Sequence, residues 1–528
     1  MECDASTKEE PVPKEKPFLL RGQVIDGTGR KAFPGEVWVE EGRIVRVRSG
    51  FSRSAPRRYS RIGTDCAFIA PGFIDTHGHS DHFLLIDPRA ESKVLQGVTT
   101  EVIGNCGSSA APLPPRLHKF WMRNLVRFGL APEWESLSEY IELLARAHPA
   151  VNVVTLVGHA TLAAGLGKQE NVSGRGGEAK RVRCLMERFR KCLDEGAAGI
   201  SFGLAYPEGL TAGWDEVLAL ARTAAEADRI AAFHVRDEGA GIVAAVNEML
   251  EIGARSGVRI QYSHIKTLGK RAERQGARIE RMLSRAREEG VRLSADLYPY
   301  TFAAMTFPEG LSQASGIPPA QLRVPTTRTR DALRRYLFEE GGLRIRIFDA
   351  PRKEWCGQRL CDFRDPIEKL WGLIRMGRAV TAAFPGISRA NLDRFLRLDC
   401  VAIGTDAANR SREGALHYGA VHPRAFGTFP RFLNRWVRRK KALTWENAIH
   451  RITSRPAEWF GLRDRGLLKE GYFADIVLFR PDKIEDRATF SDPFRAPVGI
   501  EGVWVNGVRV VERGGRLTGR RPGVVIRF

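Results

Sequence analysis

Two histidines that stand two residues apart are the first side chains in this sequence that could do chemistry together. His77 and His79 follow a proline, a glycine and a short apolar run in the stretch 71–82. Residues two apart on a strand point to the same face, so both imidazoles would project from the C-terminal end of such a strand. Two imidazoles are half of a metal-ligand set. Alone, the pair could also be two polar loop residues.

Further candidate ligands follow other apolar runs. Cys106 stands between glycines in Gly104-Asn105-Cys106-Gly107, and three more runs end in His234, His264 and Asp406. Imidazole, thiolate and carboxylate are the ligands that zinc prefers. Their irregular separations exclude a local zinc finger and require ligands from several strands. A catalytic zinc keeps one position open for water, and Asp406 is then expected to orient that water and take its proton.

The ligands can meet only if the apolar runs form one parallel sheet. From residue 71 to about 460, short apolar runs alternate with long helical patterns, which is typical of βα units. Eight such units close into a TIM-like (β/α)8 barrel with its active site at the C-terminal strand ends, so we predict an α/β fold of this kind. The predicted strands are Gly72–His77, Thr99–Gly104, Val151–Val157, Ala198–Phe202, Ile230–His234, Val258–His264, Arg292–Leu297 and Cys400–Asp406.

The two ends of the chain have a different texture. Residues 1–16 are polar and are expected to be a disordered extension, whereas 17–70 and 463–528 contain short strands and turns. Asn506-Gly507, between two apolar runs, predicts a hairpin. We therefore predict a composite β-sandwich domain from 17–70 and 463–528. The barrel domain, 71–462, would then be inserted between these two segments.

One connection inside the barrel is too long for a single βα unit. Residues 302–399 begin with a Pro/Gly/Ser-rich piece and continue with a helical pattern from Thr329 to Glu340 and an apolar run from Leu343 to Phe348. Long insertions of this kind are usually functional. We predict an inserted subdomain, or lid, between the seventh and eighth barrel strands.

Composition limits the class of protein. The 528 residues include 83 Lys plus Arg and 62 Asp plus Glu, a net charge of +21, which favours anionic partners. No nucleic-acid-binding motif accompanies the basic runs, so nucleic-acid and membrane partners are not expected. The eight cysteines form no C-x-x-C pair, which favours a reducing compartment. With no secretory signal and no long apolar run, a cytoplasmic location is expected.

Together, these stretches resemble a known family over nearly the whole chain. Pro71–His79 resembles the opening signature of the amidohydrolase superfamily, and the other motifs resemble the D-aminoacylase (N-acyl-D-amino-acid deacylase) family. The motifs are Gly97-Val98-Thr99-Thr100, Gly104-Asn105-Cys106-Gly107, Tyr206-Pro207, His234-Val235-Arg236-Asp237-Glu238, Ser263-His264-Ile265-Lys266, Asp296-Leu297-Tyr298-Pro299-Tyr300, Ile403-Gly404-Thr405-Asp406 and the run from His422 to Arg431.

The resemblance implies a role for each matched residue. Cys106, His234 and His264 would hold a tight zinc ion, while His77 and His79 would line a second, weaker site that shares Cys106. Asp406 would be the catalytic acid and base. In many relatives the fourth strand supplies a carboxylated lysine, but here that strand, 199–203, has no lysine. This argues against the dihydroorotase-like and hydantoinase-like branches.

The same resemblance places the substrate. Lys266 would bind the carboxylate of an N-acyl amino acid, with help from Tyr206 and Tyr298. Arg424 is a further partner, because guanidinium binds carboxylate in a bidentate manner. The leading prediction is zinc-dependent hydrolysis of N-acyl-D-amino acids. The alternatives are a dipeptidase or deamidase on the same scaffold and a non-catalytic basic scaffold. The pocket run Thr301–Met305 departs from the family pattern, and oligomeric state is not predicted.

Overall fold

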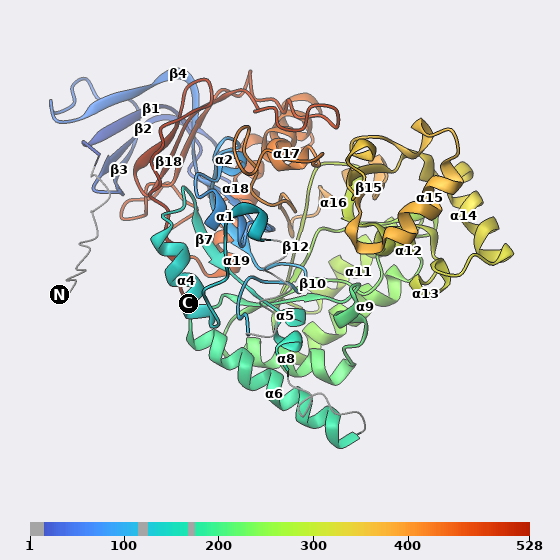
Figure 1. Cartoon of the computed structure of the whole chain (residues 1–528). Coiled ribbons are helices and arrows are strands. Elements are labelled where there is room, and N and C mark those ends of the chain that lie inside the picture. Colours follow the sequence, from blue (N-terminus) through green and yellow to red (C-terminus); the bar gives the residue numbers. More distant parts are fainter. Residues whose placement is uncertain (1–14, 115–124, 167–174) are drawn as a thin grey trace, which may run out of the picture.

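The computed structural model describes residues 15–114, 125–166 and 175–528 (Figure 1). Residues 1–14 of the predicted disordered extension lie outside this part of the chain, but Glu15 is placed and its carboxylate pairs with Arg520 at 2.7 Å. In the described part, no helix is both long and apolar enough to cross a membrane.

Strands from both ends of the chain form one eight-stranded sheet, in the order β20-β19-β18-β17-β4-β1-β2-β3. The antiparallel pairing of β17 with β4 joins the two segments, as predicted. Asn506 and Gly507, with φ of 49° and 78°, form the predicted hairpin turn. The strands are β1 (Phe18–Val24), β2 (Phe33–Glu40), β3 (Arg43–Ser49), β4 (Ser60–Pro71), β17 (Ile476–Phe479), β18 (Ile500–Val505), β19 (Val508–Glu512) and β20 (Arg516–Leu517).

The predicted barrel strands are present as two parallel sheets, in the orders β16-β12-β11-β10-β9-β8 and β21-β7-β6-β5. Most are shorter than predicted, and Val151–Val157 divides into two strands that belong to different sheets. The strands are β5 (Phe73–Asp75), β6 (Val98–Ile103), β7 (Asn152–Thr155), β8 (Val157–Gly158), β9 (Gly199–Gly203), β10 (Ile230–His234), β11 (Arg259–Tyr262), β12 (Leu293–Leu297) and β16 (Val401–Ile403).

The C-terminal segment does more than complete the first sheet. Its last strand, β21 (Val525–Ile526), pairs in parallel with β7 instead of joining the N-terminal strands. Asn506 connects the two regions, because its side-chain amide donates to Asn152 Oδ1 at 2.9 Å and to the carbonyl of Pro522 at 2.8 Å. The chain end therefore anchors the eight-stranded sheet to the parallel strands.

Amphipathic helices surround the parallel strands (Figure 1). Their buried faces contribute to one large apolar core; α9, for example, buries Ile242, Val246 and Met249. The helices outside the insertion are α1 (Phe83–Ile86), α2 (Glu91–Val94), α4 (Leu137–Arg146), α5 (His159–Ala164), α6 (Arg175–Asp194), α7 (Pro207–Leu210), α8 (Trp214–Glu226), α9 (Ile242–Ser256), α10 (Gly269–Glu273), α11 (Gly276–Glu288), α17 (Arg424–Phe432), α18 (Trp445–Ile452) and α19 (Ser454–Phe460).

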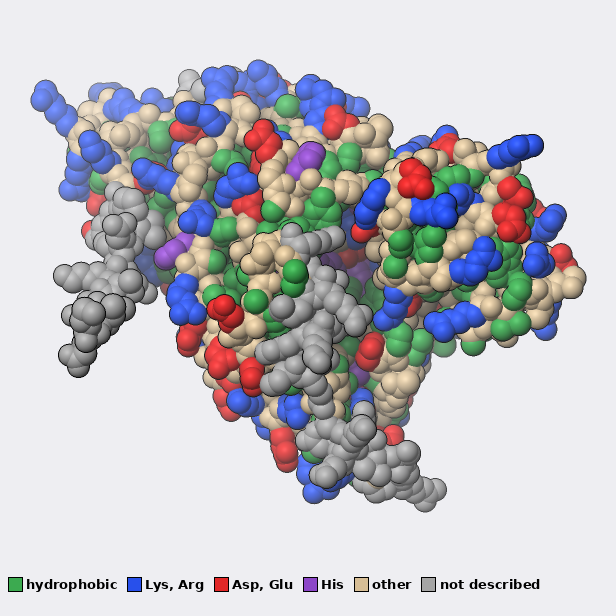
Figure 2. All heavy atoms as spheres, viewed as in Figure 1, with side chains coloured by type: hydrophobic (Ala, Val, Ile, Leu, Met, Phe, Trp, Pro, Cys, Tyr) green, Lys and Arg blue, Asp and Glu red, His purple; other side chains and the backbone are tan. Residues whose placement is uncertain are grey.

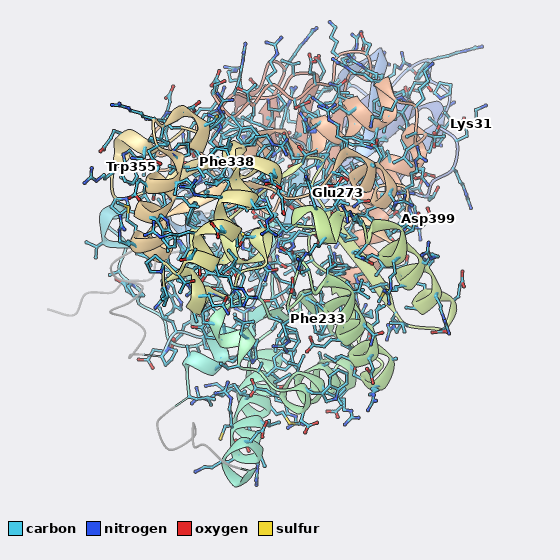
Figure 3. All side chains as sticks on the ribbon, turned by 90° about the vertical axis from the view of Figure 1, so that its right-hand side faces the viewer. Lys31, Phe233, Glu273, Phe338, Trp355 and Asp399 are labelled. Carbon is cyan, nitrogen blue, oxygen red and sulfur yellow. The ribbon has the colours of Figure 1, made fainter. Side chains whose placement is uncertain are left out.

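Most of the segment 302–399 forms a compact unit beside the strand ends, with an apolar core that extends to Phe384. Its last helix, α16, packs into the main core through Leu392 and Phe395. Figure 3 faces this unit, which carries Phe338 and Trp355. The predicted helix and strand are both present, although the strand begins three residues later than predicted. The elements are β13 (Phe302–Thr306), α12 (Phe307–Ser315), α13 (Pro319–Leu322), α14 (Thr327–Glu339), β14 (Arg346–Asp349), α15 (Pro366–Met376), β15 (Thr381–Pro385) and α16 (Arg389–Phe395).

Hydrogen bonds connect the two parallel sheets on both sides. On one side, the amide of Ala198, directly before β9, donates to the carbonyl of Thr155 in β7 at 2.9 Å. On the other, Gly78 and Ala407 form a parallel bridge that joins the loops after β5 and β16. A fully buried lysine strengthens this second connection. Lys93 Nζ lies 2.8 Å from Asp75 Oδ2, 2.8 Å from the Ala407 carbonyl and 3.0 Å from Glu101 Oε1.

Lys93→Met tests the energetic weight of this buried lysine. Removing one partner of a buried ion pair leaves an uncompensated charge, so we expect a loss of about 3–5 kcal/mol in the free energy of unfolding. Lys440→Met is the matched control, because Lys440 and Asp393 form a half-exposed surface pair, and such pairs contribute about 0–1 kcal/mol. Urea titrations of both variants measure the difference. Equal midpoints would show that the buried network does not stabilise the fold.

Candidate metal centre and active site

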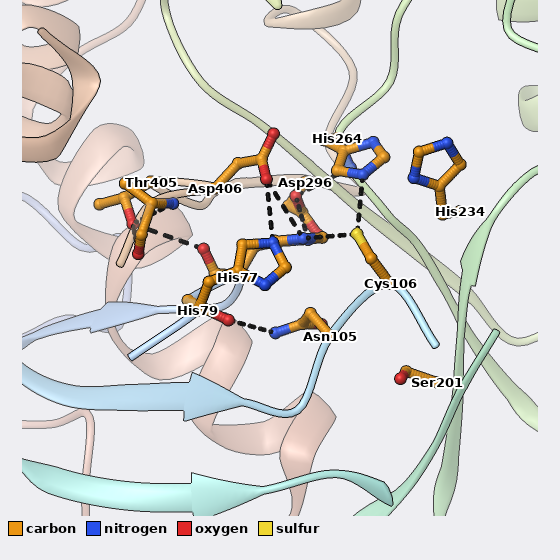
Figure 4. A network of polar contacts seen from close by, with 12 residues as sticks. His77, His79, Asn105, Cys106, Ser201, His234, His264, Asp296, Thr405 and Asp406 are labelled. Carbon is orange, nitrogen blue, oxygen red and sulfur yellow. Dashed lines mark hydrogen bonds and ion pairs between the residues drawn. The ribbon is translucent and has the colours of Figure 1, made fainter. Parts of the chain in front are cut away.

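The side chains predicted to bind metal converge at the C-terminal ends of the parallel strands (Figure 4). Ligand atoms of His77, Cys106, His264 and Asp406 all lie within 4.8 Å of one another, and all four residues are buried. Cys106 Sγ lies 3.1 Å from His264 Nε2 and 3.3 Å from His77 Nε2. One thiolate, two imidazoles and a carboxylate at this spacing could hold a zinc ion.

The remaining predicted ligands lie around this cluster. His234, Glu238 and His264 form a second group of three ligand atoms within 4.8 Å of one another. His234 Nδ1 is buried and has no hydrogen-bond partner in the described residues. Such a nitrogen is available to bind a metal. His79 Nε2 lies 3.1 Å from Asp406 Oδ1. The five predicted ligands and Asp406 are therefore brought together.

The loop backbones that carry three of these side chains are unusual. Cys106, His264 and Asp406 have φ of 55°, 35° and 48°, in the left-handed region that residues other than glycine rarely adopt. Gly104, which turns the chain after β6, has φ of 76°, and a Cβ there would lie 2.0 Å from the carbonyl oxygen of Leu156. The strands end early because the chain turns sharply to point these side chains inward.

Electrostatics hold the cluster in charged states. Burial alone would raise the pKa of the Cys106 thiol, but the imidazoles of His264 and His77 bring this pKa well below its usual range. Burial also opposes ionisation of Asp406. The Arg424 guanidinium, 2.7 Å from Asp406 Oδ2, nevertheless holds the pKa of that carboxyl well below its ordinary value. The surroundings therefore favour the anionic form of both groups.

Two carboxylates behind the ligands were not assigned a role from the sequence, although both stand in the quoted motifs. Asp296 Oδ1 lies 3.2 Å from His77 Nδ1 and accepts the His264 amide at 2.9 Å. Glu238 Oε1 lies 3.3 Å from His264 Nδ1. Carboxylates in this position orient imidazole ligands. Both could have been predicted from their position, because each is an acidic residue in or just after a buried strand.

Lys266 and Glu238 form a buried pair next to the cluster. Lys266 Nζ lies 3.1 Å from Glu238 Oε1 and 3.0 Å from His264 Nδ1, and the lysine is only 3% exposed. Burial would raise the pKa of the Glu238 carboxyl, but the Lys266 ammonium outweighs this effect and the pKa falls to about 2. The lysine predicted to bind substrate thus already has an anionic partner.

The other predicted substrate residues border the same space. The Tyr206 ring lies 4.9 Å from the His234 ring, and the Arg424 guanidinium lies 4.5 Å from the Tyr298 ring. Within the described part of the chain, Tyr298 OH and Arg424 Nε are buried without a hydrogen-bond partner. A cavity of about 320 Å3, lined by Asp406, Arg424 and strands of the insertion, opens beside them.

Comparisons with known proteins agree with this geometry. Residues 400–511 match the model of the amidohydrolase family. The chain is 33% identical to an N-acyl-D-glutamate deacylase of Alcaligenes xylosoxydans xylosoxydans over 96% of this chain and 95% of that protein. It is 30% identical to a D-aminoacylase of the same organism over 96% of this chain and 97% of the relative.

Solved structures give the same result. The N-acyl-D-glutamate deacylase of Bordetella bronchiseptica, solved with zinc and a phosphonate mimic of the tetrahedral intermediate, superposes with a TM-score of 0.82 at 32% identity, covering 97% of this chain and 100% of that chain. An L-hydantoinase of Arthrobacter aurescens, 15% identical, reaches a TM-score of 0.56 over 97% of this chain and 100% of its own, and shares the fold alone. The chain therefore belongs to the N-acyl-D-amino-acid deacylase (D-aminoacylase) family of amidohydrolases.

Proposed function

We propose that this protein is a zinc-dependent hydrolase that cleaves the amide bond of N-acyl-D-amino acids and releases a carboxylate and a free D-amino acid. The observation that carries the proposal is the buried cluster of His77, Cys106, His264 and Asp406 at the strand ends. Relatives that match nearly the whole chain are named as deacylases of N-acyl-D-glutamate and N-acyl-D-aspartate.

In this proposal the two parallel sheets act as one TIM-like (β/α)8 barrel, which spans residues 71–462 and includes the insertion 302–399. The hydrogen bonds that join the sheets on both sides support a closed barrel. The segments 17–70 and 463–528 form the composite β-sandwich domain around their shared sheet. The insertion borders the cavity beside Asp406 and would serve as its lid.

Cys106, His234 and His264 would hold the tight zinc ion, and His77 with His79 would provide a second, weaker site that shares Cys106. The low pKa of the thiol and the unpartnered Nδ1 of His234 support this ligand set. A bound zinc ion would polarise the acyl carbonyl and lower the pKa of a water molecule. Asp296 and Glu238 would keep His77 and His264 in the ligating orientation.

Asp406 would move the protons of the reaction. Its surroundings favour the anionic carboxylate, which would accept a proton from the attacking water and then donate it to the leaving amide nitrogen. His79, at 3.1 Å, and Arg424, at 2.7 Å, contact the two carboxylate oxygens and fix the orientation of the group. The burial of Asp406 restricts access of bulk water to this step.

The substrate carboxylate would be bound by Lys266, Arg424, Tyr206 and Tyr298. Arg424 Nε and Tyr298 OH have no hydrogen-bond partner in the described residues, so a carboxylate would satisfy both donors. Lys266 could contribute only by sharing its charge between Glu238 and the substrate. Fixing the carboxylate on one side of the metal ligands would allow only one configuration of the α-carbon to present its amide.

Metal content tests the ligand set. Purified protein should retain about one zinc ion per chain after dialysis, since a thiolate and two imidazoles form a strong site. Cys106→Ala should lose this ion, whereas Cys400→Ala, at a buried cysteine outside the cluster, should keep it. Elemental mass spectrometry of each protein measures the number of zinc ions per chain. Full zinc occupancy in Cys106→Ala would refute the assignment.

Turnover tests the acid and base. Asp406→Asn should retain the fold and most of the zinc but lose at least about 10²-fold in kcat, the scale of general acid–base catalysis. Asp349→Asn is the matched control, because Asp349 lines the same cavity but pairs with the exposed Lys353. If Asp406→Asn turned over at a near-normal rate, another group would have to move the proton.

Paired substrates test the carboxylate contacts. Lys266→Met and Arg424→Met should each lower kcat/KM more for a free-acid substrate than for its neutral amide. The expected difference is roughly 10- to 100-fold, because a hydrogen bond to a charged group contributes about 1.5–3 kcal/mol. The ratio between the two substrates cancels general damage to the metal centre. If a substitution lowers kcat/KM equally for the free acid and for the neutral amide, the residue that it replaces does not bind the carboxylate.

The side chain of the preferred substrate can be tested in the same way. Arg410 lines the cavity beside Asp406 and packs on the Tyr418 ring at 4.4 Å; it has no carboxylate partner in the described residues. We expect N-acyl-D-glutamate or N-acyl-D-aspartate to be hydrolysed with higher kcat/KM than N-acyl-D-leucine or N-acyl-D-methionine, and Arg410→Gln to reduce this preference. If the apolar substrates have the higher kcat/KM at both low and high salt, the predicted acidic preference is wrong, but the proposed hydrolysis is not affected.

A further inference from the structure

A second cavity, of about 910 Å3, lies between the insertion and the loops after β9 and β10. Its walls come from α7 and the β10 loop on the barrel side and from α12, α13 and α15 on the insertion side. No lining residue is shared with the cavity beside Asp406. The space is nearly three times as large as that cavity. Ala205 and Pro207, which line it, flank the proposed substrate residue Tyr206, but none of the residues assigned to the reaction lines it.

One part of the cavity wall is apolar. Trp371, Ile374 and Leu322 line it and are buried to 5%, 8% and 2% exposure. At the rim, Leu210 is 48% exposed, and Val324, between the lining residues Arg323 and Pro325, is 55% exposed. These two are among the few large apolar side chains that the described part of the protein exposes. A ligand with an apolar portion would cover them.

The other part of the wall is basic. Five arginines line the cavity, and two of them form ion pairs. Arg236 pairs with Glu248 at 2.7 Å and Arg378 with Glu309 at 2.6 Å. Asp237 and Glu368 also line the cavity and pair with no cation in the described residues, although Asp237 accepts the backbone amides of Gly239 and Gly241. The other three arginines have no carboxylate partner within the described ranges. These three are Arg323, Arg330 and Arg375. The cavity therefore combines an apolar wall with an excess of positive charge.

Trp371 and Arg330 lie near each other in the cavity wall. The Arg330 guanidinium lies 5.6 Å from the Trp371 ring. An anion bound in the cavity would pair with this guanidinium, and the indole ring would cover an apolar part of the same ligand.

We propose that this cavity binds an amphipathic carboxylate, of the size of a medium-chain fatty acid, at a site separate from the metal centre. The arginines would bind the carboxylate, since guanidinium matches its two oxygens, and the apolar wall would cover the chain. Inorganic phosphate or a short acid such as acetate would leave the apolar wall exposed. The site does not depend on the proposed hydrolysis, although that reaction also releases a carboxylate.

Calorimetric titration of the full-length protein with decanoate, below its micellar concentration, tests the proposal. Decanoate should bind at one site, whereas acetate and decanol, which each lack one half of the ligand, should bind at least about tenfold more weakly. Cys106→Ala should bind decanoate as the unchanged protein does, because the cavity shares no residue with the metal cluster. Loss of binding in Cys106→Ala would instead locate the ligand at the metal centre and refute the proposal.

Variants of the exposed arginines locate the site. Arg323→Gln/Arg375→Gln should weaken decanoate binding roughly tenfold, because each exposed charge pair adds only a small factor. The double variant should still hydrolyse a short N-acyl substrate if the proposed function holds. Arg278→Gln, at an exposed arginine of α11 outside the cavity, is the matched control.

A cavity-filling variant provides an independent measurement. Ser312→Trp places a large side chain in the cavity wall without removing a charge, and it should abolish decanoate binding while the melting temperature stays close to that of the unchanged protein. Hydrogen exchange should slow in α12 and α13 when decanoate is added. Undiminished binding in the double variant, or equal binding of acetate and decanoate, would overturn the proposal.

Discussion

The geometry of the candidate active site depends on one buried carboxylate, Asp75. Its Oδ1 accepts the backbone amides of His77 at 3.2 Å and Thr405 at 2.8 Å, and its Oδ2 accepts the ammonium of Lys93 at 2.8 Å. The loops that carry His77 and Asp406 therefore converge on the side chain of Asp75. An isolated buried carboxylate would be costly. Lys93 neutralises this one, and the ammonium in turn requires Glu101 and the Ala407 carbonyl. The network links β5, α2, β6 and the loop after β16 directly below the metal cluster.

Above this network, the site is assembled from backbone that most residues avoid. Cys106, His264 and Asp406 all have positive φ, at a cost of order 1–3 kcal/mol each. Such strain persists only where the surroundings fix it. The Asp406 amide donates to the His77 carbonyl at 2.7 Å, and the His264 amide donates to Asp296. The same hydrogen bonds that stabilise these turns bring the three side chains to one point, so the strain is part of the preorganisation of the site.

This explains which features could be predicted from the sequence. The alternation of apolar runs and helical patterns located β10 and its His234 correctly, because a buried parallel strand has a strong apolar signal. Most of the other strands were predicted too long, whereas β6 and β9 have the predicted length and are shifted by one residue. The turns at Cys106 and Asp406 are imposed by long-range hydrogen bonds that leave no local pattern. The Glu238–Lys266 pair was missed for the same reason. A lysine two residues after a ligand has the same sequence signal whether it faces a substrate or a buried glutamate 28 positions earlier in the chain.

The strand β9 departs from the pattern expected for relatives with a carboxylated lysine. In relatives with a carboxylated lysine, the fourth strand supplies a metal ligand. Here this strand presents Ser201 (Figure 4). Its hydroxyl donates to the Gly104 carbonyl at 2.6 Å and accepts the Gly107 amide at 3.0 Å. Ser201 thus holds both ends of the loop that carries Cys106. The basic side chains, by contrast, are spread over the body and the insertion (Figure 2). The net charge of +21 is therefore not gathered at one site on this face of the molecule. The candidate site depends instead on the few buried groups that the loops position.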